Sequence, residues 1–331
     1  MPQPGPRVRY AQFRRAALLC IWPVFMALPA VAQSYPDKSV RIIVPFAAGG
    51  PADVYARFIG QKLQEALGQT FIIDDRPGGG AIVGTEAAAK APADGYTLLL
   101  MSNTHTVNES LYRDKPYQLL RDFVPVAPIN YSDLVLVVHP SVPAANMKEL
   151  LALARAKPGS LNYASSGPGT PYHMAGELFK AMAGVDIVHV PYKGSAGART
   201  DVIGGQVQMM FDAVTTMAPL VRSGKLRALG TTGTTRTLVL ADVPTVAEAG
   251  VPGFDATIWL GIMAPAGTPK AIVERLNIEI GKVTNATVVK ENWKKQGATP
   301  IQMNADQFAS YVREDIDKWA KIVKLSGATV E

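Results

Sequence analysis

The residues best suited to bind a small molecule lie in two glycine-rich segments of similar design. The first supplies Phe46, Ala47, Ala48, Gly49, Gly50 and Asp53, and the second supplies Ser165, Ser166, Gly167, Thr170 and His173. Pro51 and Pro171 suit the first position of a helix, and Thr170 is a plausible N-cap. A helix start offers unpaired N–H donors and partial positive charge, so two of them across a cleft would hold an anion. The alternative is that both are ordinary strand-to-helix turns.

Two further segments rich in hydrogen-bond donors also follow predicted strands. They contain Ser102, Asn103, Thr104 and His105, and Tyr192, Lys193, Gly194 and Ser195. Ligands of open α/β sheets bind at the carboxyl ends of strands, where all four segments lie. Asp212 ends another predicted strand, where it either caps the next segment or meets the ligand. Lys193 is the single basic residue of the four segments, and we expect it to face water.

The sequence contains little that points to catalysis, a metal or a cofactor. The four histidines, at positions 105, 139, 173 and 189, show neither metal-ligand spacing nor a Gly-x-Ser-x-Gly motif. Arg76-Pro77-Gly78-Gly79-Gly80 resembles a dinucleotide loop, but Val83 stands where that motif needs Gly or Ala. The alternative to a ligand-binding protein is a secreted hydrolase with Ser165 or Ser166 as nucleophile. Such a serine needs a base within hydrogen-bond reach, and the sequence places none there.

The first 32 residues have the pattern of a secretory signal peptide. Four arginines precede an apolar run that ends in Ala30-Val31-Ala32, a small-residue cleavage site. A transmembrane anchor is the alternative, but Pro23 and Pro29 interrupt a run already short for a membrane span. We therefore predict cleavage after Ala32 and a periplasmic location. Cys20, the single cysteine, leaves with the signal, so the mature chain has no disulfide.

Composition predicts a globular protein of about two domains. The chain has 331 residues, of which 48% are hydrophobic and 18% charged. Removal of the signal peptide takes four of 33 basic residues and no acid, which leaves 29 basic against 27 acidic residues and a net charge of +2. With no basic cluster in the sequence, we expect no nucleic-acid partner.

Hydrophobic patterning predicts an α/β fold. Continuously apolar runs favour strands buried on both faces, as in parallel sheets covered by helices. The predicted strands are Val40–Pro45, Phe71–Asp74, Tyr96–Met101, Leu134–Val138, Leu161–Ala164, Ile187–Val190, Val207–Phe211, Leu226–Gly230 and Ile258–Met263. Helical spacing of apolar residues separates them, for example at Val54, Phe58, Leu63 and Leu67.

Two of these strands are suited to cross between lobes, because prolines follow both. If Leu134–Val138 and Ile258–Met263 cross, residues 33–137 and 256–331 form lobe 1 and residues 138–255 form lobe 2. The last helix would then pack on lobe 1. Its apolar stripe is Phe308, Val312, Ile316, Trp319 and Ile322.

Several motifs in order resemble one known family, the Bug-type extracytoplasmic solute receptors of tripartite tricarboxylate transporters. The resemblance covers essentially the whole mature chain. It rests on Val-Pro-Phe-x-x-Gly-Gly at 44–50, Arg-Pro-Gly at 76–78, Lys-Ala-Pro-Ala-Asp-Gly-Tyr-Thr-Leu at 90–98, Leu-Asn-Tyr-Ala-Ser-Ser-Gly at 161–167, His-Val-Pro-Tyr-Lys-Gly-Ser at 189–195, Asp-Val-Pro-Thr-Val-Ala-Glu-Ala-Gly at 242–250 and Ala-Pro-Ala-Gly-Thr-Pro at 264–269.

The resemblance implies a two-lobed periplasmic-binding-protein fold, type II-like, whose cleft closes on its ligand. Each lobe would be a mostly parallel sheet flanked by helices. Ligand carboxylates would be held by backbone amides, hydroxyls and bridging waters from Phe46–Asp53, Ser102–His105, Ser165–Thr170 and Tyr192–Ser195. The family usually has Ser or Thr at the position of Ala52, so this chain lacks that hydroxyl.

The resemblance also implies a non-catalytic, monomeric receptor without a cofactor. It would capture a small organic carboxylate and deliver it to the membrane subunits of a tripartite transporter. A ligand sensor without a transport role is the alternative.

Overall fold

The computed structural model describes residues 1–5 and 35–330. The predicted cleavage site and nearly all of the predicted signal peptide lie outside the described residues. From Tyr35 onward the chain forms one compact unit. Among the helices of the described ranges, none combines the length and hydropathy that a membrane span requires.

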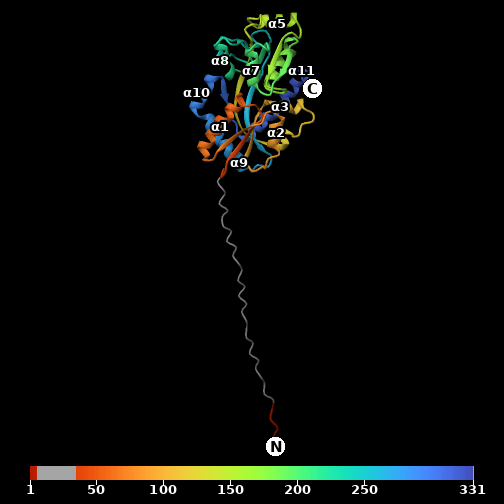
Figure 1. Ribbon diagram of the computed structural model, residues 1–331. Coiled ribbons are helices and arrows are strands. Elements are labelled where there is room, and N and C mark those ends of the chain that lie inside the picture. The colour runs from red at the N-terminus through yellow and green to blue at the C-terminus, as the bar shows by residue number, and fades with distance from the viewer. Residues whose placement is uncertain (6–34, 331) are drawn as a thin grey trace. The chain divides into compact units, whose positions relative to one another are not determined.

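A first group of strands forms sheet A, in the order β2-β1-β3-β9-β4, with β10 pairing to β4. The strands are β1 (Val40–Val44), β2 (Phe71–Asp75), β3 (Thr97–Ser102), β9 (Thr257–Pro265), β10 (Ala298–Pro300) and β4 (Phe123–Val138). The helices of this first lobe are α1 (Pro51–Leu67), α2 (Ile82–Ala89), α3 (Asn103–Leu111), α4 (Leu119–Asp122), α9 (Lys270–Asn285), α10 (Thr287–Gln296) and α11 (Ala305–Ser326). Figure 1 shows the blue C-terminal elements beside the orange N-terminal ones.

A second group of strands forms sheet B, in the order β4-β7-β5-β6, with β8 pairing to β4. Its strands are β5 (Asn162–Ser165), β6 (Val188–Pro191), β7 (Met209–Ala213) and β8 (Arg227–Thr231). The helices of this second lobe are α5 (Met147–Ala156), α6 (Pro171–Ala183), α7 (Ser195–Ile203), α8 (Val214–Arg222) and the 3-10 helix η1 (Leu238–Leu240). The α/β, two-lobed fold class is therefore confirmed, but the expectation that each sheet is mostly parallel is wrong. The strand β1 pairs parallel with β2 and β3, and β5 pairs parallel with β6 and β7. Every antiparallel pairing involves β4 or β9, the strands predicted to cross between the lobes. The apolar runs predicted burial on both faces, which does not by itself fix strand direction.

One strand, β4, belongs to both sheets. Residues Phe123–Asp133 pair with β9 in sheet A, and Leu134–Val138 pair with β7 and β8 in sheet B. The predicted strand Leu134–Val138 is thus only the second half of a 16-residue strand. Pro125 and Pro128 hid its first half, because prolines inside a run argue against a strand, and both lie near register shifts. The residue boundaries of the lobes stay a prediction.

All nine predicted strands overlap an observed strand, but two are less buried than expected. The strands of the sheet interior follow the expectation, since β7 is buried at every residue. In contrast β2 and β6 lie at the ends of the strand order, where Ile72 and Val188 are 48% and 44% exposed. An edge strand lacks a neighbour on one side, so its apolar pattern alone does not show how deeply it is buried.

The last helix contacts both lobes rather than the first alone. Phe308 and Val312 are buried with residues of sheet A, as predicted. Trp319 packs with Val107 of α3 and also with Met174 of α6, a helix of the second lobe. The stripe also contains a buried carboxylate, Asp315, which the apolar pattern did not predict.

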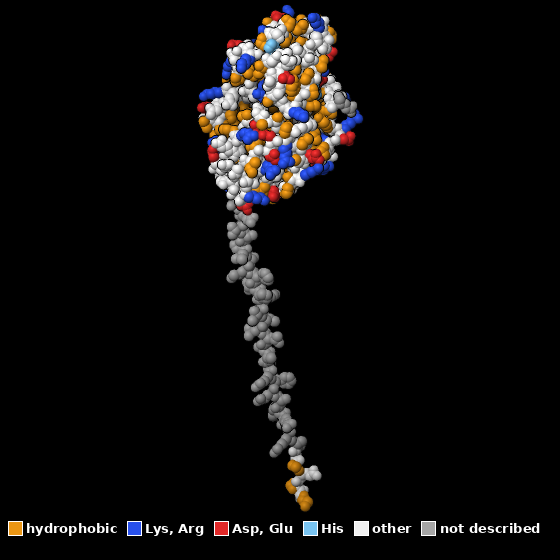
Figure 2. All heavy atoms as spheres, viewed as in Figure 1, with side chains coloured by type: hydrophobic (Ala, Val, Ile, Leu, Met, Phe, Trp, Pro, Cys, Tyr) orange, Lys and Arg blue, Asp and Glu red, His pale blue; other side chains and the backbone are white. Residues whose placement is uncertain are grey.

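The described surface carries charges of both signs. On the face drawn in Figure 2, basic and acidic side chains are interspersed, as the nearly balanced composition predicts.

Candidate ligand-binding cleft

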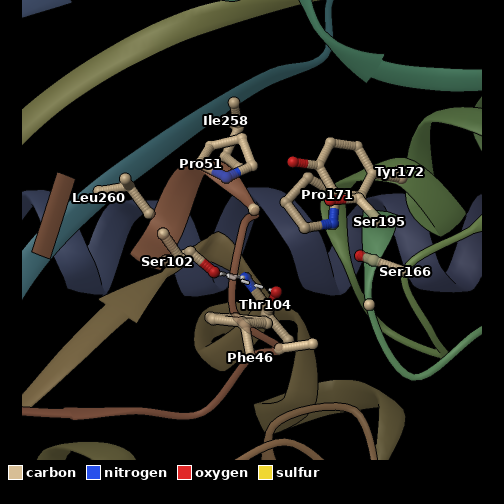
Figure 3. A pocket seen from close by; sticks show the side chains of 14 residues that line it. Phe46, Pro51, Ser102, Thr104, Ser166, Pro171, Tyr172, Ser195, Ile258 and Leu260 are labelled. Atoms are coloured by element: carbon tan, nitrogen blue, oxygen red, sulfur yellow. Dashed lines mark hydrogen bonds between the residues drawn. The ribbon is translucent and has the colours of Figure 1, made fainter. Parts of the chain in front are cut away.

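A cleft between the two lobes gathers residues from all four predicted segments. Eight predicted residues line it: Phe46, Ala47, Gly50, Ser102, Thr104, Ser166, Gly194 and Ser195. The lining also includes Pro51, Ala52, Pro171, Tyr172, Ile258 and Leu260, which were not on the predicted site list. In Figure 3 the first-lobe residues Ser102 and Thr104 lie opposite Ser166 and Ser195 of the second lobe.

Four helix N-termini meet at this cleft. Helix α1 starts at Pro51 after the extended residue Gly50, and α6 starts at Pro171 after the N-cap Thr170, as predicted. Helices α3 and α7 start at Asn103 and Ser195. Each N-terminus contributes unpaired N–H groups and partial positive charge, so together they favour an anion over a cation.

The segment after β3 is a helix start rather than the loop that was expected. Helix α3 begins at Asn103, immediately after the strand, because Ser102 and His105 form a capping box. His105 Nδ1 lies 3.1 Å from the backbone nitrogen of Ser102. His105 is the third residue of the helix, where a capping box usually has Glu or Gln. A histidine in this role made the helix start hard to recognise in the sequence.

His105 serves this cap and does not line the cleft. It is fully buried, and desolvation lowers its pKa to about 4. The neutral imidazole is therefore the folded form at neutral pH, whereas an unfolded chain would take a proton near pH 6.5.

We expect His105→Gln to change how stability depends on pH. Glutamine keeps the capping acceptor but has no titrating group. Between pH 7 and pH 5 the unfolded wild type gains a proton that the folded protein refuses, so wild type loses about 2 kcal/mol of unfolding free energy that the variant does not lose. Urea unfolding of both proteins at the two pH values measures this difference. Equal losses in both proteins would contradict the buried neutral histidine.

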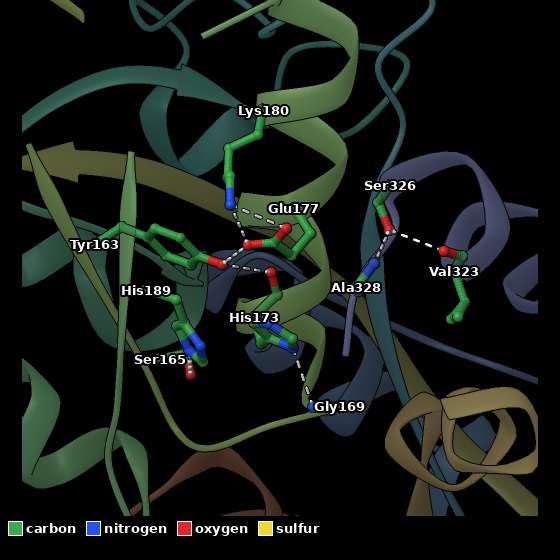
Figure 4. Close-up of polar contacts among 10 residues, drawn as sticks. All are labelled: Tyr163, Ser165, Gly169, His173, Glu177, Lys180, His189, Val323, Ser326 and Ala328. Atoms are coloured by element: carbon green, nitrogen blue, oxygen red, sulfur yellow. Dashed lines mark hydrogen bonds and ion pairs between the residues drawn. The ribbon is translucent and has the colours of Figure 1, made fainter. Parts of the chain in front are cut away.

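A partly buried histidine, His189, contacts Ser165 behind the cleft wall. His189 Nε2 lies 2.6 Å from Ser165 Oγ, and the His189 ring stacks on His173 with ring centroids 4.1 Å apart. Figure 4 shows this cluster extending through Tyr163 to Glu177 and Lys180. Burial lowers the pKa of His189 to about 3 and that of His173 to about 4, so both rings are neutral at neutral pH.

The Ser165–His189 pair brings together a serine and a base that the sequence could not connect. However, Ser165 is fully buried and its oxygen accepts a hydrogen bond from the Gly167 N–H at 3.1 Å. It is Ser166, not Ser165, that lines the cleft. The geometry therefore makes Ser165 a support for its loop.

Most other predicted residues also hold the cleft loops in shape rather than line the cleft. Asp53 accepts from the Gly49 N–H at 2.8 Å, and Asn103 donates to the Thr257 carbonyl at 2.9 Å. Thr170 caps α6 and donates to the Gly167 carbonyl at 2.7 Å. These hydrogen bonds to nearby backbone compete with ligand contact. Asn103 Oδ1, in contrast, is buried without a hydrogen-bond partner in the described part of the chain.

The remaining predicted residues are not among those that line the cleft. His173 Nδ1 accepts from the Gly169 N–H at 3.1 Å, and the Tyr192 hydroxyl donates to Asp201 at 2.6 Å. Lys193 is exposed, as predicted, and so are Ala48 and Gly49. Asp212 lies fully buried behind the second-lobe wall, 3.0 Å from Arg199.

The missed lining residues carry no sequence signal of their own, apart from the two prolines. Ile258 and Leu260 alternate along β9 and look like any core positions of a buried strand. Tyr172 follows Pro171 in a helix start and is buried. Ala52 does line the cleft, so a methyl group stands where the resemblance led us to expect a hydroxyl.

Comparison with known proteins decides the family. Residues 55–328 match the family model described as the tripartite tricarboxylate transporter family receptor, TctC. The chain belongs to the TctC family. It is 38% identical over 308 residues to the protein BugT of Bordetella pertussis, covering 92% of this chain and 94% of BugT.

Two solved structures are similar to this TctC-family receptor. The Rhodopseudomonas palustris protein Rpa4515 with adipate is 36% identical, with a TM-score of 0.86 over 89% of this chain and 99% of that one. MatC from Rhodopseudomonas palustris with bound malate is 31% identical, with a TM-score of 0.83 over 87% of this chain and 100% of MatC. The TctC-family receptor is thus a periplasmic solute-binding receptor by family.

Glycines lie where the two lobes of the receptor touch. A Cβ atom added to Gly194 would lie 2.6 Å from the Cβ of Ala47, and one added to Gly169 would lie 2.5 Å from Asn108 Oδ1. A Cβ on Gly80 would collide with the Pro168 carbonyl oxygen. We call these three glycines the closure seam. Close packing at the closure seam therefore accounts for Gly80 in the Gly78–Gly80 run, and no bound dinucleotide is needed to explain this glycine.

Proposed function

We propose that the receptor captures a small organic carboxylate in the cleft between its lobes and delivers it to the membrane subunits of a tripartite tricarboxylate-type transporter. The observation that carries the proposal is the meeting of four helix N-termini with hydroxyl groups on both walls of one cleft. That lining offers hydrogen-bond donors to an anion from two lobes at once.

The bound ligands of the two relatives support the carboxylate class. Adipate in Rpa4515 and malate in MatC are both dicarboxylates. A dicarboxylate suits a cleft with donors on opposite walls, because each carboxylate can meet one lobe. Closure then follows from differential affinity, since only the closed form offers both sets of donors.

Hydrogen-bond donors also suit a receptor that must release its cargo. A directly buried ion pair would require deep desolvation of both charges, whereas N–H and O–H donors bind without it. Lys193 is exposed, so it contributes little to this mechanism. We propose that the chain works as a monomer in the periplasm after cleavage at Ala32, and that it has no catalytic step.

Calorimetry with a panel that includes adipate and malate tests the proposal. We expect at least one acid to bind, and Ser166→Ala to weaken it about tenfold or more, because a lost hydrogen bond to a charged group costs about 1.5–3 kcal/mol. Lys193→Met and the exposed control Ser160→Ala should bind nearly as wild type. Binding to no acid in the panel, or ester hydrolysis by the purified protein, would overturn the receptor function.

A further inference from the structure

A cationic side chain lies directly behind the second-lobe wall of the cleft. Arg199 is one helical turn after Ser195 in α7, so both side chains share a face of the helix. Arg199 Nη2 donates to Ser195 Oγ at 2.9 Å, and Ser195 lines the cleft. The Ser195 oxygen is thereby used as an acceptor, which leaves its hydrogen free to be donated into the cleft.

A buried carboxylate lies on the other side of Arg199. The Arg199 Nε and Asp212 Oδ2 atoms are 3.0 Å apart, and the two side chains are 17% and 0% exposed. Neither atom has a hydrogen bond of good geometry within the described part of the chain, so charge rather than alignment holds the pair together. The carboxylate lies in contact with the guanidinium, so it offsets part of the positive charge that an anion in the cleft would otherwise experience.

We propose that Arg199 is the positioning residue through which the cleft selects negatively charged ligands, acting through the Ser195 hydroxyl, and that Asp212 limits how much of the Arg199 charge the ligand experiences. The proposal rests on the proposed function and names the specificity determinant of the same site.

The physical argument starts from the serine. A hydroxyl that accepts a charged hydrogen bond becomes a stronger donor, because successive hydrogen bonds polarise one another. Ser195 Oγ also lies close to the opposite lobe, since a Cβ on Gly50 would be 3.3 Å from it. The polarised donor therefore lies where the lobes meet. A carboxylate gains more from such a donor than a neutral amide does.

Asp212 makes the effect depend on pH. The groups that act on its carboxyl are Arg199 of α7, Tyr172 of α6 and the N–H of Ala213 beside α8. In the neighbouring strand β4, the apolar residue Val135 pairs with Asp212. In the other neighbouring strand, β5, Tyr163 pairs with Met209, which is three residues before Asp212. Burial raises the pKa of Asp212 to about 6, although Arg199 opposes the rise.

The sign of the pH dependence follows from charge. An anionic ligand close to Arg199 repels the ionised Asp212, so binding favours the protonated carboxyl and takes up a proton. Affinity for a dicarboxylate should therefore rise severalfold as the pH falls from 7.5 to 6. Asp212→Asn, which is always neutral, should bind more tightly than wild type at pH 7.5 and lose this pH dependence.

Calorimetry on the full receptor tests the proposal, with the acid of the panel that wild type binds and its neutral diamide as probes. We expect Arg199→Met to weaken acid binding about tenfold or more and to leave diamide binding nearly unchanged. In a Ser195→Ala background, Arg199→Met should cause little further loss, because Arg199 acts through that hydroxyl. The double variant Arg199→Met/Asp212→Asn removes both charges, so it should fold even if the single variant does not, and it should bind as weakly.

The outcomes separate this inference from the proposed function. Opposite effects of Arg199→Met and Asp212→Asn support it, because a purely structural ion pair predicts that both weaken binding. If both variants weaken the acid and the diamide alike, Arg199 is only structural and the inference is wrong, while the receptor function stands. If wild type binds no acid of the panel, the proposed function fails and the inference fails with it.

Discussion

The Gly194→Ala receptor is expected to bind its ligand about tenfold to 100-fold more weakly than wild type. The new methyl group would lie 2.6 Å from the Ala47 Cβ across the cleft, closer than two carbon atoms can approach. Both atoms are carried directly by backbone, so the lobes must separate to relieve the clash. Overpacking of this kind costs about 1–3 kcal/mol. It destabilises only the closed form, so the cost appears as weaker binding.

The reciprocal substitution provides the matched control. Ala47→Gly removes the opposing methyl group, so Ala47→Gly/Gly194→Ala should recover most of the lost affinity. Gly194 has extended backbone with φ of 165°, which alanine adopts without strain, so the open form and its stability should be nearly unchanged. Calorimetry gives the affinities, and small-angle scattering with saturating ligand should show that the single variant compacts less. Wild-type affinity in Gly194→Ala would show that the closure seam does not control binding.

Asp315→Ala is expected to cost about 3 kcal/mol or more of unfolding free energy and to weaken ligand binding as well. The Asp315 Oδ2 atom accepts from the Thr106 hydroxyl at 2.6 Å and from Trp259 Nε1 at 3.1 Å. Removing the acceptor leaves the buried Trp259 N–H unsatisfied, at about 1–3 kcal/mol. It also removes the Thr106–Asp315 hydrogen bond, although the Thr106 hydroxyl can still donate to the Asn103 carbonyl at 2.8 Å. Thr106 lies in the first turn of α3, and Trp259 lies between Ile258 and Leu260, so both parts of the first-lobe wall lose their common anchor.

Asp315→Asn separates the hydrogen bonds from the charge. The amide oxygen can accept from both donors, so we expect this variant to be at least as stable as wild type at pH 7. Burial raises the pKa of Asp315, which means that the folded protein disfavours its ionised form and that wild type becomes less stable as the pH rises through this titration. Urea unfolding of the three proteins at pH 7 gives the comparison. Equal destabilisation by alanine and asparagine would show that the charge, not the hydrogen-bond acceptor, matters.

Helix starts and strands could be predicted because their signals are local. Thr170 and Pro171 start α6, and Pro51 starts α1, as their positions indicated. The same local reading misplaced the segment after β3, where a histidine replaces the usual Glu or Gln of the capping box. It also missed the first half of β4, because prolines inside a run argue against a strand. The pairing with β9 is irregular near Pro125 and Pro128, and this irregularity accommodates both prolines.

The candidate site was predicted by segment but not by side chain. Ser165, Thr170 and Asn103 have the residue types that bind carboxylates, yet their polar groups satisfy nearby backbone or His189. Sequence cannot separate these two uses of a hydroxyl or amide, because both occur in the same turn chemistry. Arg199 was missed because it lies outside the four segments, one helical turn beyond Ser195.

The amino-acid sequence by itself determined the α/β class, the starts of α1 and α6 and the family motifs, because each depends on residues a few positions apart. Only the tertiary structure decided which residues line the cleft, that Asp212 lies against Arg199, and that Gly194 faces Ala47. Those contacts join residues that are far apart in the chain, for example Ala47 and Gly194, which are 147 positions apart. Their geometry is set by how two sheets share the strand β4, and no local pattern of residues encodes that arrangement.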